Sequence, residues 1–240
     1  MLPQAVIFDM DGLMFDTERL ARQAWQAAGS QLGYPIDETV LSQIRGATPA
    51  ASAEIFHQVF GASFDYPAAR ALRNTLVEQA IRRDGLPVKP GLADLLKKLR
   101  EQGISTAVAS ASSLDAIQWY LALANLTDFF QVIVSGVDVP RSKPAPDVFL
   151  LAAARLNVTA DACLVLEDSS NGLRAAKAAG MRAICIPDIA LPTAEALTCA
   201  EAVLSSLAEV WPWLQGAAQI CNETADTHET PSGNRTFCSD

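Results

Sequence analysis

Short apolar runs alternate with helical segments from residue 92 onward, and this alternation constrains the fold more than any other feature of the chain. Each run is almost continuously apolar, as expected for a strand that is buried on both faces of a sheet. Strands that alternate with helices indicate a parallel sheet covered on both sides. The sequence therefore predicts an α/β protein with a Rossmann-like parallel-sheet core. The apolar runs lie at residues 104–109, 132–134, 163–166, 183–186 and 202–204.

The first part of the chain contains one more strand and then a long helical segment. Residues 5–8 are apolar and indicate the first strand of the same sheet. Residues 16–85 show amphipathic helical patterns without a buried strand, which predicts an inserted helical cap domain. The core domain would then combine residues 1–15 with residues 86–215. Residues 216–240 are polar, turn-rich and acidic, so we expect a disordered tail there.

The charge balance restricts the class of partner. The chain carries 18 Lys and Arg residues against 27 Asp and Glu residues, a net charge of -9. This excess of negative charge disfavours nucleic acid and anionic membranes as partners. No apolar run is long enough to span a bilayer, and the segment Met1-Leu-Pro-Gln lacks the features of a signal peptide. A cytoplasmic location is therefore the expectation.

Acids, a hydroxyl and a lysine follow the carboxyl ends of four predicted strands. In an open α/β sheet these ends meet at one edge, where ligands bind. Taken singly, the hydroxyl, the lysine and the second pair of acids are better explained by a helix cap, a solvated loop and the acidic start of a helix. Together they supply oxygen ligands for a cation, a positive charge and a hydroxyl donor, which are the parts that phosphoryl transfer requires. The residues are Asp9, Asp11, Ser110, Lys143, Glu167 and Asp168.

The expected cation is Mg²⁺. This ion prefers oxygen ligands, and one or two carboxylates together with a substrate phosphate commonly hold it. Zinc is disfavoured because the sequence shows no cluster of His and Cys residues with metal-ligand spacing.

The order of these residues resembles the four motifs of the haloacid dehalogenase (HAD)-like hydrolase superfamily. Asp9-Met-Asp-Gly12 resembles the first motif and Ser110 the second, while Lys143 within Ser-Lys-Pro-Ala-Pro-Asp147 resembles the third and Glu167-Asp168 the fourth. The similarity extends over residues 5–214. It is to subfamily IA, which carries a C1 helical cap and includes β-phosphoglucomutase-like and pseudouridine-5'-phosphatase-like proteins.

The resemblance implies a role for each residue. Asp9 would be the nucleophile that forms an aspartyl-phosphate, and Asp11 would act first as general acid and then as general base. Lys143 and Ser110 would bind the phosphate. The implied activity is Mg²⁺-dependent hydrolysis of a small phosphomonoester, a sugar phosphate or a nucleoside monophosphate-like metabolite. The implied metal ligands are Asp9, Asp11 through its backbone carbonyl, Asp168, and Glu167 directly or through water.

Three other functions are compatible with parts of this pattern. Metal-independent dehalogenases of this fold lack the second aspartate of the first motif, so Asp11 disfavours them. A sugar phosphomutase of the β-phosphoglucomutase type is closer, but Ala21 stands where those mutases carry a cap histidine. A non-enzymatic phospho-acceptor or binding protein remains a further alternative, although a phospho-acceptor domain needs no cap.

The substrate is not identified by these motifs. Resemblance to capped sugar phosphatases makes Arg45, in a turn between cap helices, a candidate contact for polar substrate groups. A solvated surface arginine explains it almost as well. Small phosphorylated metabolites are the expected partners, and the resemblance implies a monomer.

Overall fold

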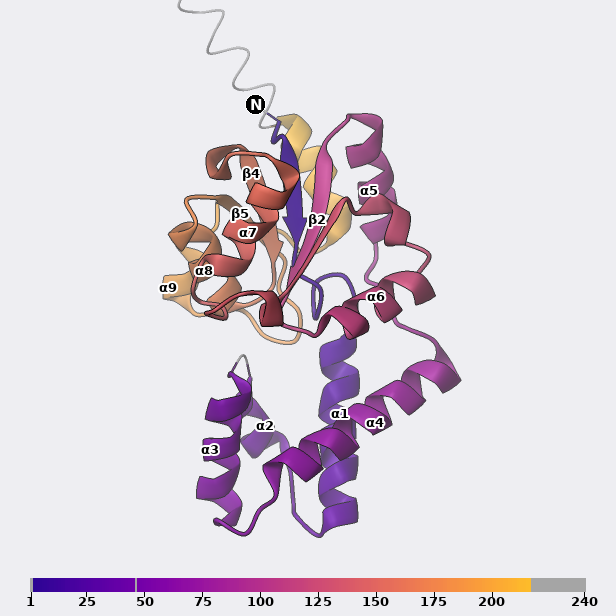
Figure 1. The fold of residues 1–240 in the computed structure, drawn as a ribbon, viewed down its shortest axis with the longest axis vertical. Helices are drawn as coiled ribbons and strands as arrows, with labels where there is room; N and C mark the ends of the chain where they lie inside the picture. Colours follow the sequence, from indigo (N-terminus) through magenta and orange to yellow (C-terminus); the bar gives the residue numbers. More distant parts are fainter. Residues whose placement is uncertain (1, 46, 217–240) are drawn as a thin grey trace, which may run out of the picture.

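The computed structural model describes residues 2–45 and 47–216, and a six-stranded parallel sheet lies at its centre (Figure 1). The strands are β1 (Ala5–Phe8), β2 (Ser105–Ser110), β3 (Val132–Ser135), β4 (Cys163–Glu167), β5 (Arg182–Cys185) and β6 (Ala202–Val203). Their order is β3-β2-β1-β4-β5-β6, and each neighbouring pair is parallel. The predicted α/β, Rossmann-like fold is thus confirmed.

Apolar side chains of β1 alternate between two clusters on opposite faces of the sheet. Val6 and Phe8 pack with residues of the helices 92–101 and 114–123 and of the segment 210–216, whereas Ala5 and Ile7 pack with residues of the helices 147–156 and 170–178. Burial on both faces explains why this strand has no polar residue. The α-helices after the insertion are α5 (Leu92–Glu101), α6 (Leu114–Leu123), α7 (Asp147–Leu156), α8 (Ser170–Ala178) and α9 (Ala194–Leu197), and residues 210–216 are also helical. The 3₁₀ turns are η1 (Thr127–Phe129), η2 (Gly136–Asp138), η3 (Ala160–Ala162) and η4 (Leu207–Glu209).

Four helices occupy the segment between β1 and α5. They are α1 (Thr17–Leu32), α2 (Glu38–Ile44), α3 (Pro49–Phe60) and α4 (Tyr66–Asp84). Figure 1 shows them beyond the end of the sheet toward which the β1 arrow points. They have an aromatic core of their own, in which Trp25, Phe56 and Tyr66 pack together. Side chains that accept hydrogen bonds from backbone N–H groups begin three of these helices, at Asp37, Thr48 and Asp65.

The two segments that join these helices to the sheet run side by side. Phe15 and Val88 form an antiparallel bridge, and the Asp16 N–H donates to the Pro87 carbonyl over 2.9 Å. The Lys89 N–H in turn donates to the Met14 carbonyl over 2.9 Å. These backbone bonds fix the first residues of α1 close to the carboxyl end of β1.

The observed element boundaries differ slightly from the predicted ones. The strand predicted at 104–109 is shifted by one residue, so that Ser110 is its last member. Helix α8 begins at Ser170, because the Ser169 hydroxyl accepts the Gly172 N–H and caps it. The predicted tail, residues 216–240, lies outside the described residues except for residue 216. Within 2–45 and 47–216, no helix combines the length and apolar character needed to cross a membrane.

Candidate active site

The strand-end residues gather at the carboxyl edge of three adjacent strands, β2, β1 and β4. Asp9 follows the last residue of β1, and its N–H donates to the Leu166 carbonyl in β4 over 3.0 Å. Ser110 is the last residue of β2, and Glu167 is the last residue of β4. The structure thus brings together side chains that lie more than 150 residues apart in the sequence.

Lys143 connects the first and fourth motifs. Its Nζ lies 2.5 Å from Oδ1 of Asp9 and 2.6 Å from Oε1 of Glu167, and it donates to the Ala109 carbonyl over 3.1 Å. Burial by itself lowers the pKa of this lysine, but the charges of Asp9 and Glu167 outweigh burial and raise it above its usual value. The ammonium therefore remains charged between two carboxylates.

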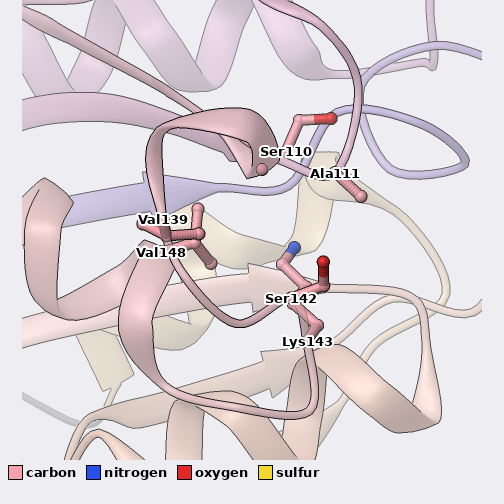
Figure 2. Close-up of a pocket in the computed structure, with 7 residues that line it drawn as sticks. Ser110, Ala111, Val139, Ser142, Lys143 and Val148 are labelled. Carbon is pink, nitrogen blue, oxygen red and sulfur yellow. The ribbon is translucent and has the colours of Figure 1, made fainter. Parts of the chain in front are cut away.

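Figure 2 shows where the lysine loop meets the end of β2. Ser142 and Lys143 rise from one loop toward the strand end at Ser110. A cavity of about 10 Å³ lies here, with room for about one water molecule. Ser110 is buried, and its Oγ accepts a hydrogen bond from the Ser112 N–H over 3.1 Å. Its hydroxyl thus fixes the turn after β2 at the edge of the site.

The nucleophile candidate has a perturbed proton affinity. Burial raises the pKa of Asp9 to about 7; Lys143 opposes this shift, while the nearby charge of Glu167 adds to it. Burial and the charges of Glu167 and Asp9 likewise raise the pKa of Asp168. The single positive charge of Lys143 therefore does not balance the three carboxylates of Asp9, Glu167 and Asp168, and a bound cation would stabilise their ionised forms.

Glu167 and Asp168 are adjacent in the sequence but differ in their surroundings. Glu167 is fully buried, and its Oε2 accepts from the backbone N–H groups of Asp168 and Ser169 and from the Ser169 hydroxyl. Its Oε1 contacts Lys143. Asp168 is only partly buried, and one oxygen each of Asp9, Glu167 and Asp168 lie within 4.8 Å of one another. Such an all-oxygen cluster suits a hard divalent cation such as Mg²⁺.

Gly12 allows the close packing of this cluster. Its φ of 87° is a conformation that side chains disfavour, and a Cβ at this position would overlap Oδ2 of Asp168. The glycine after the paired aspartates is therefore required both by the turn and by the approach of Asp168.

Asp11 lies outside the three-carboxylate cluster and is held by two hydroxyls. Thr17 Oγ1 donates to Oδ1 over 2.7 Å, and Ser112 Oγ donates to Oδ2 over 2.7 Å. Sequence reasoning missed both hydroxyls. The position of Ser112, two residues after Ser110, could have suggested a second hydroxyl at the site. Thr17 gave no such signal, because it indicated only the start of a helix.

Two residues of the inserted helices also lie near Asp11, and sequence reasoning missed them. Burial raises the pKa of Glu18, and the charges of Asp11 and Asp188 raise it further. The guanidinium carbon of Arg73 lies 5.3 Å from the ring centre of Trp25, and burial lowers the pKa of Arg73. The Arg73 Nε is buried without a hydrogen-bond partner among the described residues.

Arg45 lies in a different environment. It is exposed, and its Nη2 is 3.9 Å from Oε1 of Glu38. This long contact among the described residues agrees with a solvated surface arginine. Its proposed contact with substrate stays a prediction.

Comparison with known proteins agrees with this geometry. A model of the haloacid dehalogenase-like hydrolase family matches residues 3–180. Hexitol phosphatase B of Escherichia coli (strain K12) is 33% identical over 213 residues, which cover 86% of this chain and 93% of that protein. β-Phosphoglucomutase of Bacillus subtilis (strain 168) is 33% identical over 190 residues, which cover 75% of this chain and 82% of that protein.

A solved structure is similar to this chain in both fold and sequence. CbbY from Rhodobacter sphaeroides, crystallised in complex with phosphate, superposes with a TM-score of 0.75 at 29% identity. The match covers 87% of this chain and 96% of that one. The chain therefore belongs to the haloacid dehalogenase-like hydrolase family, and it is an enzyme of the phosphatase class.

Proposed function

We propose that the protein hydrolyses a small phosphomonoester, a sugar phosphate or a similar metabolite, with Mg²⁺ and through an aspartyl-phosphate at Asp9. One observation carries this proposal: Oδ1 of Asp9 lies 2.5 Å from the buried ammonium of Lys143, within a cluster of carboxylates. A carboxylate held this way is positioned as a nucleophile, and Lys143 can neutralise charge on an incoming phosphate.

The carboxylates divide between two tasks in this proposal. Asp9, Asp168 and the backbone carbonyl of Asp11 would hold Mg²⁺, which supplies positive charge to the phosphate when bound. Both oxygens of Glu167 already have partners. We therefore assign Glu167 to fixing Lys143, with at most an indirect contact to the cation.

Asp11 is suited to proton transfer. Its two oxygens are held by Thr17 and Ser112, so the carboxyl group has a fixed orientation beside Asp9. It would give a proton to the leaving oxygen and later take one from the water that attacks the aspartyl-phosphate. The Ser110 hydroxyl would donate a hydrogen bond to a phosphate oxygen while its Oγ continues to accept one from the Ser112 N–H.

The helices between 16 and 85 are proposed to form a cap that covers the site, and residues 1–15 with 86–215 its core. Glu18 and Arg73 supply an acceptor and a cation on the cap side, near Asp11. Such a pair suits the hydroxyl and carbonyl groups of a small sugar phosphate. Arg45 is a more distant candidate contact. A monomeric state and a cytoplasmic location remain proposals from the sequence.

A phosphomutase is the second candidate, because one of the relatives above is a β-phosphoglucomutase. Ala21 in α1 disfavours it, since its methyl group packs against the apolar core and offers no hydrogen bond near the aspartyl-phosphate. Conversion of β-glucose 1-phosphate in the presence of glucose 1,6-bisphosphate would support the mutase. Release of inorganic phosphate without isomerised product would support the phosphatase.

The decisive experiment is a hydrolysis assay against a panel of sugar phosphates, sugar alcohol phosphates and nucleoside monophosphates, with and without Mg²⁺. Asp9→Asn is the active-site control, and Asp94→Asn, on the exposed face of α5, makes the same change in charge elsewhere. We expect Mg²⁺-dependent phosphate release by the wild type and by Asp94→Asn, and none by Asp9→Asn. Turnover by Asp9→Asn at the wild-type rate would rule out the aspartyl-phosphate.

A further inference from the structure

A buried ion pair beside the carboxylate cluster has no role in the chemistry described above. Asp188 lies three residues after β5, and its Oδ1 contacts the ammonium of Lys89. The side chain of Asp188 is only 2% exposed, and that of Lys89 is 20% exposed. Lys89 belongs to the segment that returns from the inserted helices to the sheet, so the pair joins two parts of the chain 99 residues apart.

The second oxygen of Asp188 is the unusual atom. Oδ2 is buried and has no hydrogen-bond partner in the part of the chain that the structure describes. An unsatisfied buried carboxylate oxygen is costly, so such an atom calls for a ligand that the protein alone does not provide.

This oxygen lies close to the turn at Gly12. A Cβ placed on Gly12 would overlap Oδ2 of Asp168 and would lie 3.4 Å from Oδ2 of Asp188. Both oxygens thus flank the same point at the turn after Asp11. Asp188 therefore faces the carboxylate that the proposed function assigns to the cation.

We propose that Asp188 is an outer member of the cation site, and that its Oδ2 accepts a hydrogen bond from a water molecule bound to Mg²⁺. Mg²⁺ keeps several of its waters when carboxylates hold it. Outer groups that accept from these waters orient the ion and raise its affinity. Lys89 holds the other oxygen, which fixes the carboxylate and offsets part of its charge. This inference rests on the proposed function, because it assumes a cation between Asp9 and Asp168.

A purely structural role is the competing explanation. Lys89 Nζ also lies 3.8 Å from Oδ1 of Asp16, so the pair could simply hold the start of α1 to the core. Two substitutions separate the explanations. Asp188→Asn replaces one of the two acceptor oxygens with an amide NH₂ donor and removes a negative charge, whereas Lys89→Met removes the positive charge beside Asp188 and keeps its carboxylate group. If the pair is only structural, both changes act in the same direction.

The test measures the binding of Mn²⁺, a spectroscopic substitute for Mg²⁺, to the substrate-free protein. Electron paramagnetic resonance reports the concentration of free Mn²⁺ and so gives the affinity. We expect Asp188→Asn to bind Mn²⁺ about 10- to 100-fold more weakly than the wild type. We expect Lys89→Met to bind it more tightly, because a repelling charge is lost. Asp94→Asn should match the wild type, and thermal unfolding checks that each variant is folded.

Each outcome has a defined meaning. A folded Asp188→Asn variant with wild-type affinity, or weaker binding by both variants, would overturn the role of Asp188 and leave the proposed phosphatase intact. If Asp188→Asn does not fold, Lys89→Met decides alone: tighter binding supports the proposal, and unchanged or weaker binding overturns it. Absence of Mn²⁺ and Mg²⁺ binding by the wild type would overturn the cation site itself and, with it, the metal dependence of the proposed function.

Discussion

The hydroxyl of Thr17, the first residue of α1, donates a hydrogen bond over 2.7 Å to Oδ1 of Asp11, two residues beyond the proposed nucleophile. A helix of the inserted segment thus contacts the carboxylate that is proposed to move protons. Because the backbone bonds of Asp16 and Lys89 fix the start of α1, the orientation of Asp11 depends on both the sheet and the insertion.

Replacement of this hydroxyl is expected to lower the rate of turnover. Thr17→Val keeps the shape of the side chain but removes the donor to Asp11, so we expect kcat to fall by about 10- to 100-fold with a smaller change in KM. Steady-state phosphate release measures both constants. Thr75→Val is the matched control, since the Thr75 hydroxyl donates to the Ala71 carbonyl on the exposed surface of α4. Equal kcat values for the two variants would contradict this role of Thr17.

Lys143 is expected to stabilise the fold as well as to bind phosphate. Lys143→Met leaves Asp9 and Glu167 buried without their counter-ion, and loss of one partner of a buried ion pair costs about 3–5 kcal/mol. Urea unfolding of the metal-free protein measures this loss. Lys97→Met, at an exposed position of α5, should change the free energy of unfolding by less than about 1 kcal/mol.

A second substitution tests whether charge imbalance is the cause. Addition of Glu167→Gln to Lys143→Met removes one of the two unpaired carboxylates, so the double variant should regain part of the lost stability. It should remain inactive, because the ammonium is still absent. If Glu167→Gln lowered stability further in the Lys143→Met background, the loss would have to be attributed to packing instead of charge.

Much of the fold can be predicted from the local pattern of apolar residues in the sequence. The apolar runs were sufficient to predict the strands, because a strand buried on both faces has no polar positions, as in Ala5–Phe8. The gathering of Asp9, Ser110 and Asp168 also followed, since the carboxyl ends of parallel strands meet at one edge. Strand ends were less certain, because Ser110 can either close a strand or begin a loop.

The remaining parts of the site depend on contacts that no local pattern encodes. Glu167 and Asp168 look equivalent in the sequence, yet Glu167 is fully buried against Lys143, whereas Asp168 is partly exposed and lies against the turn at Gly12. Their difference arises because neighbouring residues at the end of a strand point to opposite sides. The contact between Lys89 and Asp188 likewise requires two segments that only the folded chain brings together.

The affinity for the cation is expected to increase with pH. Burial and the nearby Glu167 raise the pKa of Asp9 to about 7 against the effect of Lys143, so protons compete with Mg²⁺ for this carboxylate near neutrality. Between pH 6 and pH 8 the ionised fraction of Asp9 rises roughly tenfold, and the affinity of the substrate-free protein for Mg²⁺ should rise by about the same factor. Calorimetric titration with Mg²⁺ at several pH values measures it. An affinity that is constant over this range would show that Asp9 is already ionised at pH 6.

Arg73 is expected to recognise the substrate instead of taking part in the chemical step. It lies beside Trp25, and its Nε has no hydrogen-bond partner among the residues of the described ranges. A polar group of the substrate can therefore accept a hydrogen bond from this Nε. Loss of a hydrogen bond to a charged group costs about 1.5–3 kcal/mol, so Arg73→Met should raise KM about 10- to 100-fold and change kcat less. Arg70→Met, three residues earlier on the same helix and exposed, is the matched control and should leave KM unchanged. Steady-state assays with the best substrate of the panel compare them. If Arg73→Met lowered kcat at unchanged KM, Arg73 would act in the transition state, which would give α4 a part in the chemical step as well as in recognition.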